Sequence, residues 1–319
     1  MLNVAIIGCG GIGRLHAYAY SHLDNVNLCA LIDFDQARAQ ALADEFGGKV
    51  YRSIDEVPEK LDLVSVVTPP STHYAIVMDL LDRGIPVFCE KPITMDIEQA
   101  KEVARKSRES GIPVGVGFKM RYEPIFVKAK EMIGEVGKLF AVSVVKNQPY
   151  TESPRQWIKD TGCMYELSVH DYDLVHFIMD SKPVKVSAKL DYSLNWKREN
   201  QAYLDIEYDN GVVGQLMSSY STNTKWTGYD VAMTFIGEKG YMRVERPDRL
   251  VFSTDKGYYT VDVEPIGGMD IFTVQAEQFI NSLIEKTPYG ADVSAGAVAT
   301  ILIESANIAH KENRTVEIV

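Results

Sequence analysis

Residues 6–13 read IIGCGGIG and follow directly on the apolar residues Val4 and Ala5. Glycine destabilises a strand or a helix by roughly 0.5 to 1 kcal/mol relative to alanine, so a cluster of glycines indicates a requirement of the backbone. One such requirement is the close approach of a phosphate to backbone N–H groups at the start of a helix. The sequence around this stretch decides whether that interpretation holds.

The first 120 residues alternate between short apolar stretches and amphipathic ones. They predict strands at 4–7, 26–32, 61–67, 86–89 and 114–118, and helices at 12–21, 35–46, 71–83 and 96–110. Near-continuous apolar strands that alternate with helices are typical of a parallel sheet covered on both faces. The sequence therefore predicts an α/β fold with a doubly wound first domain at 1–120.

The predicted strand before the glycines and the helix after them indicate what the glycines do. Gly8, Gly10 and Gly13 match G-x-G-x-x-G between a strand and a helix, and Asp33 ends the second strand about twenty residues later. Gly8 would permit the tight turn, Gly10 would let the backbone approach a pyrophosphate, and Gly13 would allow close packing of helix on strand. Candidate cofactor contacts are these residues and their neighbours: Gly8, Gly10, Gly11, Ile12, Gly13, Asp33 and Phe34.

Asp33 bears on which dinucleotide binds. Its carboxylate would accept hydrogen bonds from the adenosine ribose and would repel a 2′-phosphate, so the sequence predicts a Rossmann domain that binds NAD rather than NADP. The alternatives are a tight turn without a ligand and an Asp33 that only caps the next helix, although Asp35 is better placed as that cap.

The second half of the chain has a different pattern. From about Lys138 long alternating stretches follow one another, and they predict a C-terminal α+β domain at 121–319 with a large, mainly antiparallel sheet. Helices are expected at 165–179, 272–285 and 295–310. A helix can cover one sheet face, and the valine, leucine and tyrosine content of the other predicts a homo-oligomer, dimer or tetramer, through this sheet.

Composition excludes several classes of partner. The net charge is −11 without a basic run, which argues against nucleic acid or an anionic membrane surface. Apolar stretches fall short of the ~20 residues that span a bilayer, and no basic segment precedes the first apolar residues. The four cysteines lie far apart, and no metal-binding motif is present. We therefore expect a cytoplasmic protein with a small-molecule substrate and no bound metal.

Two stretches could carry chemistry. Glu166, His170 and Asp173 fall at i, i+4 and i+7 and would share one helix face, either as a solvated surface or as a histidine base flanked by carboxylates. Lys91, in CEKP at 89–92, follows a strand and would lie at the carboxyl edge of the sheet, where ligands bind; a plain turn is the alternative. Three further histidines, His16, His22 and His310, are expected in solvated or capping roles.

Taken together, these motifs resemble the family of glucose-fructose oxidoreductase, inositol dehydrogenase and rhizopine-catabolism proteins, often written Gfo/Idh/MocA. The resemblance covers essentially the whole chain. It depends on IIGCGGIG with Asp33, TPPSTHY at 68–74, EKP at 90–92, GFKMRYEP at 117–124 and the stretch 166–173.

This resemblance implies roles for individual residues. Lys91 would lie beside the nicotinamide and the substrate hydroxyl, His170 would be the acid/base, and Glu166 and Asp173 would flank it. Family contacts to the nicotinamide half of the cofactor match Thr68, Pro69, His73 and Glu90, and the substrate pocket matches Arg121, Tyr122 and Trp157. Many members have aspartate at position 166, so Glu166 would either assist the histidine catalytically or bind a substrate hydroxyl.

The implied reaction is hydride transfer between a nicotinamide cofactor and a secondary hydroxyl of a sugar, a sugar acid or an inositol-type polyol. Two alternatives stay open. One is a redox-neutral enzyme that retains NAD during glycosidic cleavage or epimerisation, and the other is a dinucleotide-binding regulator without activity. Retention of Lys91, His170 and Asp173 favours an enzyme.

Overall fold

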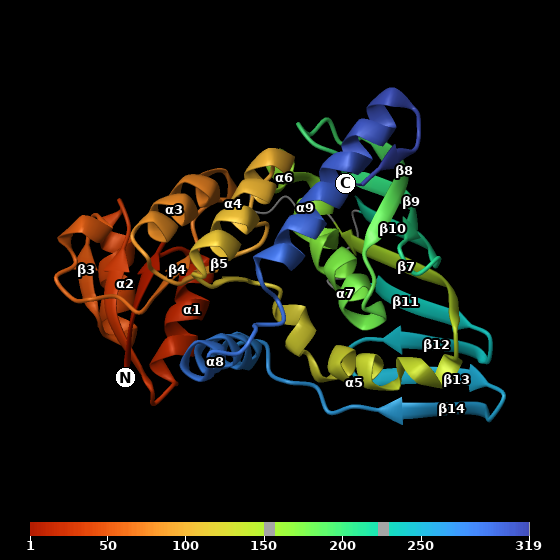
Figure 1. Ribbon diagram of the computed structural model, residues 1–319, viewed down its shortest axis with the longest axis horizontal. Helices are drawn as coiled ribbons and strands as arrows, with labels where there is room; N and C mark the ends of the chain where they lie inside the picture. Colours follow the sequence, from red (N-terminus) through yellow and green to blue (C-terminus); the bar gives the residue numbers. More distant parts are fainter. Residues whose placement is uncertain (150–156, 223–229, 319) are drawn as a thin grey trace. The chain divides into compact units, whose positions relative to one another are not determined.

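The computed structural model describes residues 1–149, 157–222 and 230–318 (Figure 1). The chain forms two compact units, one of residues 1–122 and 266–300 and the other of residues 123–265 and 301–319. The sequence-based division at 120/121 assigns 266–300 to the second domain. The structure groups this segment with the first unit, where helix α8 (Asp270–Glu285) packs against α1 (Gly11–Ser21).

The first unit is built on a six-stranded parallel sheet in the order β3-β2-β1-β4-β5-β6. Its strands are β1 (Leu2–Ile7), β2 (Val26–Ile32), β3 (Lys49–Tyr51), β4 (Leu63–Val66), β5 (Val87–Cys89) and β6 (Val114–Val116). The chain order reverses between β1 and β4, and in open α/β sheets this switch point is where ligands bind. The predicted Rossmann fold is confirmed.

The helices of this unit follow the predicted alternation. They are α1, α2 (Gln36–Phe46), α3 (Pro70–Asp82), α4 (Ile97–Ser110), the short 3₁₀ turns η1 (Ile54–Glu56) and η2 (Lys119–Tyr122), and α8. Asp35 caps α2 as expected, because its side chain accepts a hydrogen bond from Ala37 N at 3.2 Å. Ile6, Leu31, Leu63 and Phe88 are fully buried in the core.

Two glycines bring α1 onto the end of β1. Gly8 has φ +105°, a region that disfavours side chains, and a Cβ there would lie 2.8 Å from the Val67 carbonyl carbon. A Cβ on Gly13 would lie 2.1 Å from the Gly8 carbonyl oxygen. Any side chain at position 13 would therefore push the helix away from the strand.

The second unit contains a nine-stranded sheet in the order β14-β13-β12-β11-β7-β10-β9-β8-β15. Its strands are β7 (Leu139–Pro149), β8 (Pro183–Asp191), β9 (Gln201–Tyr208), β10 (Val213–Thr222), β11 (Asp230–Gly237), β12 (Gly240–Glu245), β13 (Arg249–Thr254), β14 (Gly257–Asp262) and β15 (Val316–Glu317). Strands β7 and β10 pair in parallel, and the other pairs are antiparallel. The predicted large, mainly antiparallel sheet is confirmed.

Helices cover one face of this sheet. Helix α5 (Pro124–Met132), followed by η3 (Ile133–Val136), contacts β12 and β13, and α6 (Ile158–Cys163) contacts β10. On β9, buried residues alternate with more exposed ones, and Tyr203 is among the exposed. The sheet therefore has one covered and one open face, as its alternating sequence requires.

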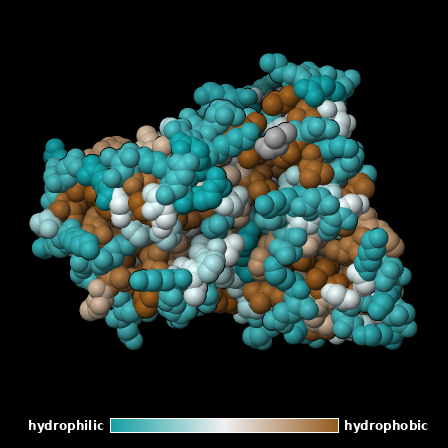
Figure 2. Space-filling model, in the orientation of Figure 1, coloured by the Kyte–Doolittle hydropathy of each residue, from teal (hydrophilic) through white to brown (hydrophobic). Residues whose placement is uncertain are grey.

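Helix α9 (Val293–Glu312) qualifies the expectation about membranes. It is long and apolar enough to cross a bilayer by length and composition, but 61% of its most apolar window is buried inside the protein. A buried apolar helix is typical of a protein core. In the view of Figure 2, hydrophilic residues cover much of the surface, in keeping with the acidic composition.

Candidate functional site

The start of α1 has the features of an anion site. A Cβ on Gly10 or Gly11 would have no heavy atom within 4 Å, so the backbone here is open to a ligand. Within the described chain, no side chain caps α1 and its first turn has no acidic residue. The first N–H groups of a helix lack partners inside the helix and carry partial positive charge. We call this open backbone at Gly10 and Gly11 the α1 cradle. Its N–H groups fit the pyrophosphate of a dinucleotide.

Asp33 is fixed beside the cradle. Its Oδ2 accepts a hydrogen bond from Cys9 N and its Oδ1 accepts one from Asp35 N, both at 2.8 Å. The carboxylate therefore links the glycine turn to the end of β2 and keeps lone pairs for a ribose. Next to these residues Ile12 and Phe34 are exposed, Phe34 to 91%, and such apolar surface suits an adenine ring.

The loop after β4 supplies the next predicted contacts. Thr68 Oγ1 lies 2.7 Å from Thr72 Oγ1, and Pro69 precedes the first turn of α3. His73 is buried, with Nε2 at 2.8 Å from the Thr68 carbonyl oxygen and Nδ1 at 2.8 Å from that of Pro92. Burial lowers the pKa of His73, and a neutral imidazole donates through one nitrogen only. The His73 ring thus lies between the loops after β4 and β5 and, when neutral, donates to one of the two carbonyl oxygens.

Glu90 and Lys91 follow β5 at the same edge of the sheet. Glu90 Oε2 accepts a hydrogen bond from Lys91 N at 3.1 Å, and Glu90 Oε1 lies 3.0 Å from His16 Nε2. The expectation of a solvated or capping His16 is wrong, because the side chain is only 3% exposed. Its partners, Ser65 and Glu90, are far away in the sequence, so no local motif predicts these contacts.

Two of the three residues that the resemblance places at the substrate pocket, Arg121 and Trp157, differ in their surroundings. Arg121, in the first unit, is buried and donates a hydrogen bond to the Gly290 carbonyl oxygen. Trp157, in the second unit, precedes α6 and is half exposed. Substrate contacts of both residues stay predictions.

The stretch with Glu166, His170 and Asp173 lies in the second unit. A π-helical turn, Met164–Ser168, leads into α7 (Val169–Met179), where the sequence predicts one continuous α-helix. A π turn carries an extra residue, which changes the angle between Glu166 and the α7 side chains. His170 and Asp173 are buried, so the interpretation as a solvated polar face is wrong. Leu167 and Leu174 are buried as well.

A buried ion pair next to His170 is not predicted from the sequence. Lys146 Nζ on β7 lies 2.9 Å from Asp171 Oδ2, and both side chains are almost fully buried. Burial raises the pKa of Asp171, and the charges of Lys146 and Arg246 oppose that rise. A buried charge needs a partner, so this pair fixes the first turn of α7 against the sheet.

Glu199 holds the segment before α7 in a similar way. Its Oε1 accepts a hydrogen bond from Met164 N at 3.0 Å, and its carboxylate fills the space beside Gly162, which has φ +75°. Its other oxygen is buried and has no hydrogen-bond partner among the described residues. Burial raises the pKa of Glu199 to about 7, because an uncompensated charge is costly there.

The predicted residues thus fall into two groups. One group lies at the carboxyl edge of the parallel sheet in the first unit and consists of Gly8 to Gly13, Asp33, Thr68, Glu90 and Lys91. The other lies in the second unit and consists of Trp157, Glu166, His170 and Asp173. The structure brings the first group together around the α1 cradle. Action of Lys91 and His170 on one substrate stays a prediction.

Family models cover both units. The model described as an oxidoreductase family with an NAD-binding Rossmann fold matches residues 2–118, and the C-terminal domain model of the same family matches residues 126–243. The chain belongs to the Gfo/Idh/MocA family. The resemblance drawn from the motifs is confirmed, and the protein is an NAD-binding oxidoreductase.

Relatives extend over the whole chain. Inositol 2-dehydrogenase of Rhizobium meliloti is 28% identical over 99% of both chains, and scyllo-inositol 2-dehydrogenase (NAD⁺) of Bacillus subtilis is 29% identical over 75% of this chain and 72% of its own. A crystal structure of a putative myo-inositol dehydrogenase from Sinorhizobium meliloti aligns over 100% of both chains with a TM-score of 0.84 and 25% identity.

The raised pKa of Glu199 predicts a pH-dependent stability. Between the ordinary glutamate pKa and about 7, the folded protein binds more protons than the unfolded one, so the free energy of unfolding falls as pH rises. Replacing Glu199 by glutamine removes this loss. The free energy of unfolding of Glu199→Gln, relative to that of the wild type, should therefore be higher at about pH 8 than at about pH 5, by on the order of 2 kcal/mol.

Urea unfolding at both pH values measures this difference. Glu207→Gln, at an exposed glutamate of β9 paired with Lys185, is the control and should leave the pH dependence unchanged. An equal effect of Glu199→Gln at the two pH values would contradict the prediction.

Proposed function

We propose that this protein is an NAD-dependent dehydrogenase that oxidises a secondary hydroxyl of an inositol-type polyol, a sugar or a sugar acid. The observation that carries the proposal is the open N-terminus of α1 on the same sheet edge as Lys91. The inositol dehydrogenases among the relatives support a cyclic polyol as substrate. We also propose that the protein is soluble and cytoplasmic.

Three groups divide the chemistry. Bound NAD supplies the acceptor for a hydride. His170 takes the proton of the substrate hydroxyl, because an imidazole exchanges protons near neutral pH. The ammonium group of Lys91 stabilises the negative charge that develops on that oxygen. Glu166 and Asp173 hold neighbouring hydroxyls, and their carboxylates orient the ring of the substrate.

Burial supports this division of roles. His170 is only 9% exposed, and Lys146 with Asp171 anchors the turn on which it lies. Charge stabilisation is stronger where water is excluded, so the shielded imidazole of His170 can act on a substrate with little competition from solvent.

Substitution of the two proposed catalytic residues tests the mechanism. Lys91→Ala and His170→Ala should each lower kcat by about 10² to 10⁴-fold, since each removes a group that acts on the reacting oxygen. The affinity for NAD should stay within about threefold, because the pyrophosphate site is built from backbone. Steady-state formation of reduced nicotinamide with a panel of inositols, aldoses and sugar acids gives kcat, and fluorescence titration gives the NAD affinity.

Lys101→Ala, at an exposed lysine of α4 paired with Glu98, is the control and should retain full turnover. Near-wild-type turnover in either Lys91→Ala or His170→Ala would remove the mechanism. Product formation without net reduction of NAD would instead identify a redox-neutral enzyme, and tight NAD binding without any product would identify a regulator.

The position of Asp33 predicts the choice of cofactor. Its carboxylate is fixed by two backbone N–H groups and cannot turn away from a 2′-phosphate without losing both bonds. We expect NADP to bind at least about tenfold more weakly than NAD, because two like charges would meet. Titration of the protein with both cofactors measures the ratio, and equal or tighter binding of NADP would refute this preference.

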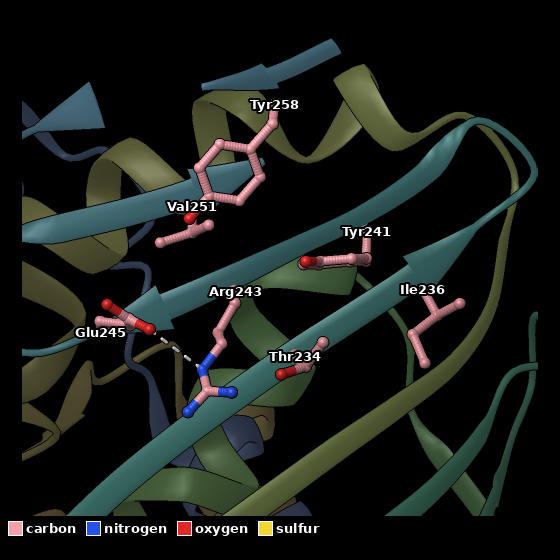
Figure 3. Close-up of a pocket in the computed structure, with 7 residues that line it drawn as sticks. All are labelled: Thr234, Ile236, Tyr241, Arg243, Glu245, Val251 and Tyr258. Carbon is pink, nitrogen blue, oxygen red and sulfur yellow. Dashed lines mark ion pairs between the residues drawn. The ribbon is translucent and has the colours of Figure 1, made fainter. Parts of the chain in front are cut away.

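The open face of the large sheet is the proposed contact for a second copy of the chain. Ile236, Tyr241 and Tyr258 project from β11, β12 and β14 around a shallow cavity of about 400 Å³ (Figure 3). Arg243 and Glu245 form an ion pair in the same cavity. A patch with apolar residues and both charges is complementary to itself across a two-fold axis.

Light scattering at micromolar concentration tests this contact. The wild type should have a mass of at least twice that of one chain, and Ile236→Asp should shift it toward the monomer by burying an unpaired charge. Ile284→Asp, at an exposed isoleucine of α8, is the control and should keep the wild-type mass. A monomeric wild type would contradict the proposal.

A further inference from the structure

His16 lies in the interior of the first unit without a role in the proposed reaction. The imidazole projects from α1, with Nδ1 at 2.8 Å from Ser65 Oγ and Nε2 at 3.0 Å from Glu90 Oε1. It packs among Tyr20, Phe88 and Phe272. A polar side chain surrounded by aromatic rings stabilises the fold only if its hydrogen bonds are made, so the bonds to Ser65 and Glu90 define its orientation.

Glu90 transmits this orientation to the loop after β5. Its carboxylate occupies the space next to Gly117, where a Cβ would lie 2.7 Å from Oε1. One carboxylate oxygen faces His16 and the other accepts the hydrogen bond from Lys91 N. Burial raises the pKa of Glu90, but His16, Lys91 and Lys119 together hold it below its ordinary value. The carboxylate is therefore an anion with a fixed place.

A second buried histidine holds the other side of the same loop. His73 Nδ1 contacts the Pro92 carbonyl oxygen, and its Nε2 contacts that of Thr68. The backbone of Lys91 is thus held at its own N–H by Glu90 and at the next residue by His73.

We propose that His16 is a positioning residue for Lys91 and acts through Glu90. By donating from Nε2 to the Glu90 carboxylate, His16 keeps the other carboxylate oxygen on the Lys91 N–H and keeps an anion close to the lysine. This inference rests on the proposed function, in which the Lys91 amine acts on the substrate oxygen. A misplacement of about 1 Å at such a group costs about 10²-fold in rate.

Two substitutions separate the contacts of His16. In His16→Gln the amide nitrogen replaces Nε2 and keeps the contact to Glu90, whereas in His16→Asn the shorter amide reaches only toward Ser65. Both variants are polar and uncharged. We expect His16→Asn to lower kcat by about 10 to 100-fold with NAD affinity unchanged, and His16→Gln to recover turnover to within about threefold of wild type.

Hydrogen exchange at the Lys91 amide tests, without any substrate, whether the hydrogen bond from Lys91 N to Glu90 depends on His16. In the wild type and in His16→Gln this N–H is bonded to Glu90 and should exchange slowly, whereas in His16→Asn it should exchange at least about tenfold faster. Peptide mass spectrometry of the segment around residue 91 measures the rates. His22→Asn, at the exposed C-cap of α1, is the control and should alter neither exchange nor turnover.

Glu90→Gln gives a second route if His16→Asn does not fold. It leaves His16 in place, removes the anion, and should reproduce the loss in kcat. Equal losses in His16→Gln and His16→Asn, or wild-type amide exchange and turnover in His16→Asn, would overturn the role of His16. A wild type that oxidises no polyol would overturn the proposed function instead, while the exchange measurement would still decide the link from His16 to Lys91.

Discussion

The contact between Gly13 and the Gly8 carbonyl oxygen is the constraint on which the first unit depends. Because position 13 has no side chain, α1 starts directly at the end of β1, and its first N–H groups open onto the switch point of the sheet. Asp33 then reaches the same turn and bonds Cys9 N. A helix start, a carboxylate and the loops after β4 and β5 thus share one edge of the sheet.

Buried polar contacts fix the surroundings of the predicted residues within each unit. His16 with Glu90 fixes the Lys91 loop, Lys146 with Asp171 fixes the first turn of α7, and Glu199 fixes the backbone before it. Each such pair is costly to bury and stabilises only one arrangement of its surroundings. These contacts therefore define where the backbone around Lys91 and around the first turn of α7 lies within each unit.

The sequence predicts those parts of the fold and site whose signals are local. The glycine spacing, the strand and helix alternation and the Asp35 cap need only neighbours along the chain, and the structure confirms them. His16 is different, since its partners are 49 and 74 residues away. The grouping of 266–300 with the first unit and the pairing of Lys146 with Asp171 likewise arise only after folding. Glu199 is also buried, although its neighbours in the sequence, Lys197 and Arg198, are charged.

The central claim is that one alcohol oxygen contacts both the Lys91 amine and the His170 imidazole while NAD occupies the α1 cradle. A crystal structure of the protein with NAD and a bound inositol tests this claim most directly. The account predicts one substrate hydroxyl within hydrogen-bond distance of Lys91 Nζ and of a ring nitrogen of His170, with the pyrophosphate on the N–H groups of Gly10 and Gly11. A ligand whose hydroxyls contact only one of the two side chains, or a pyrophosphate bound elsewhere, would contradict it.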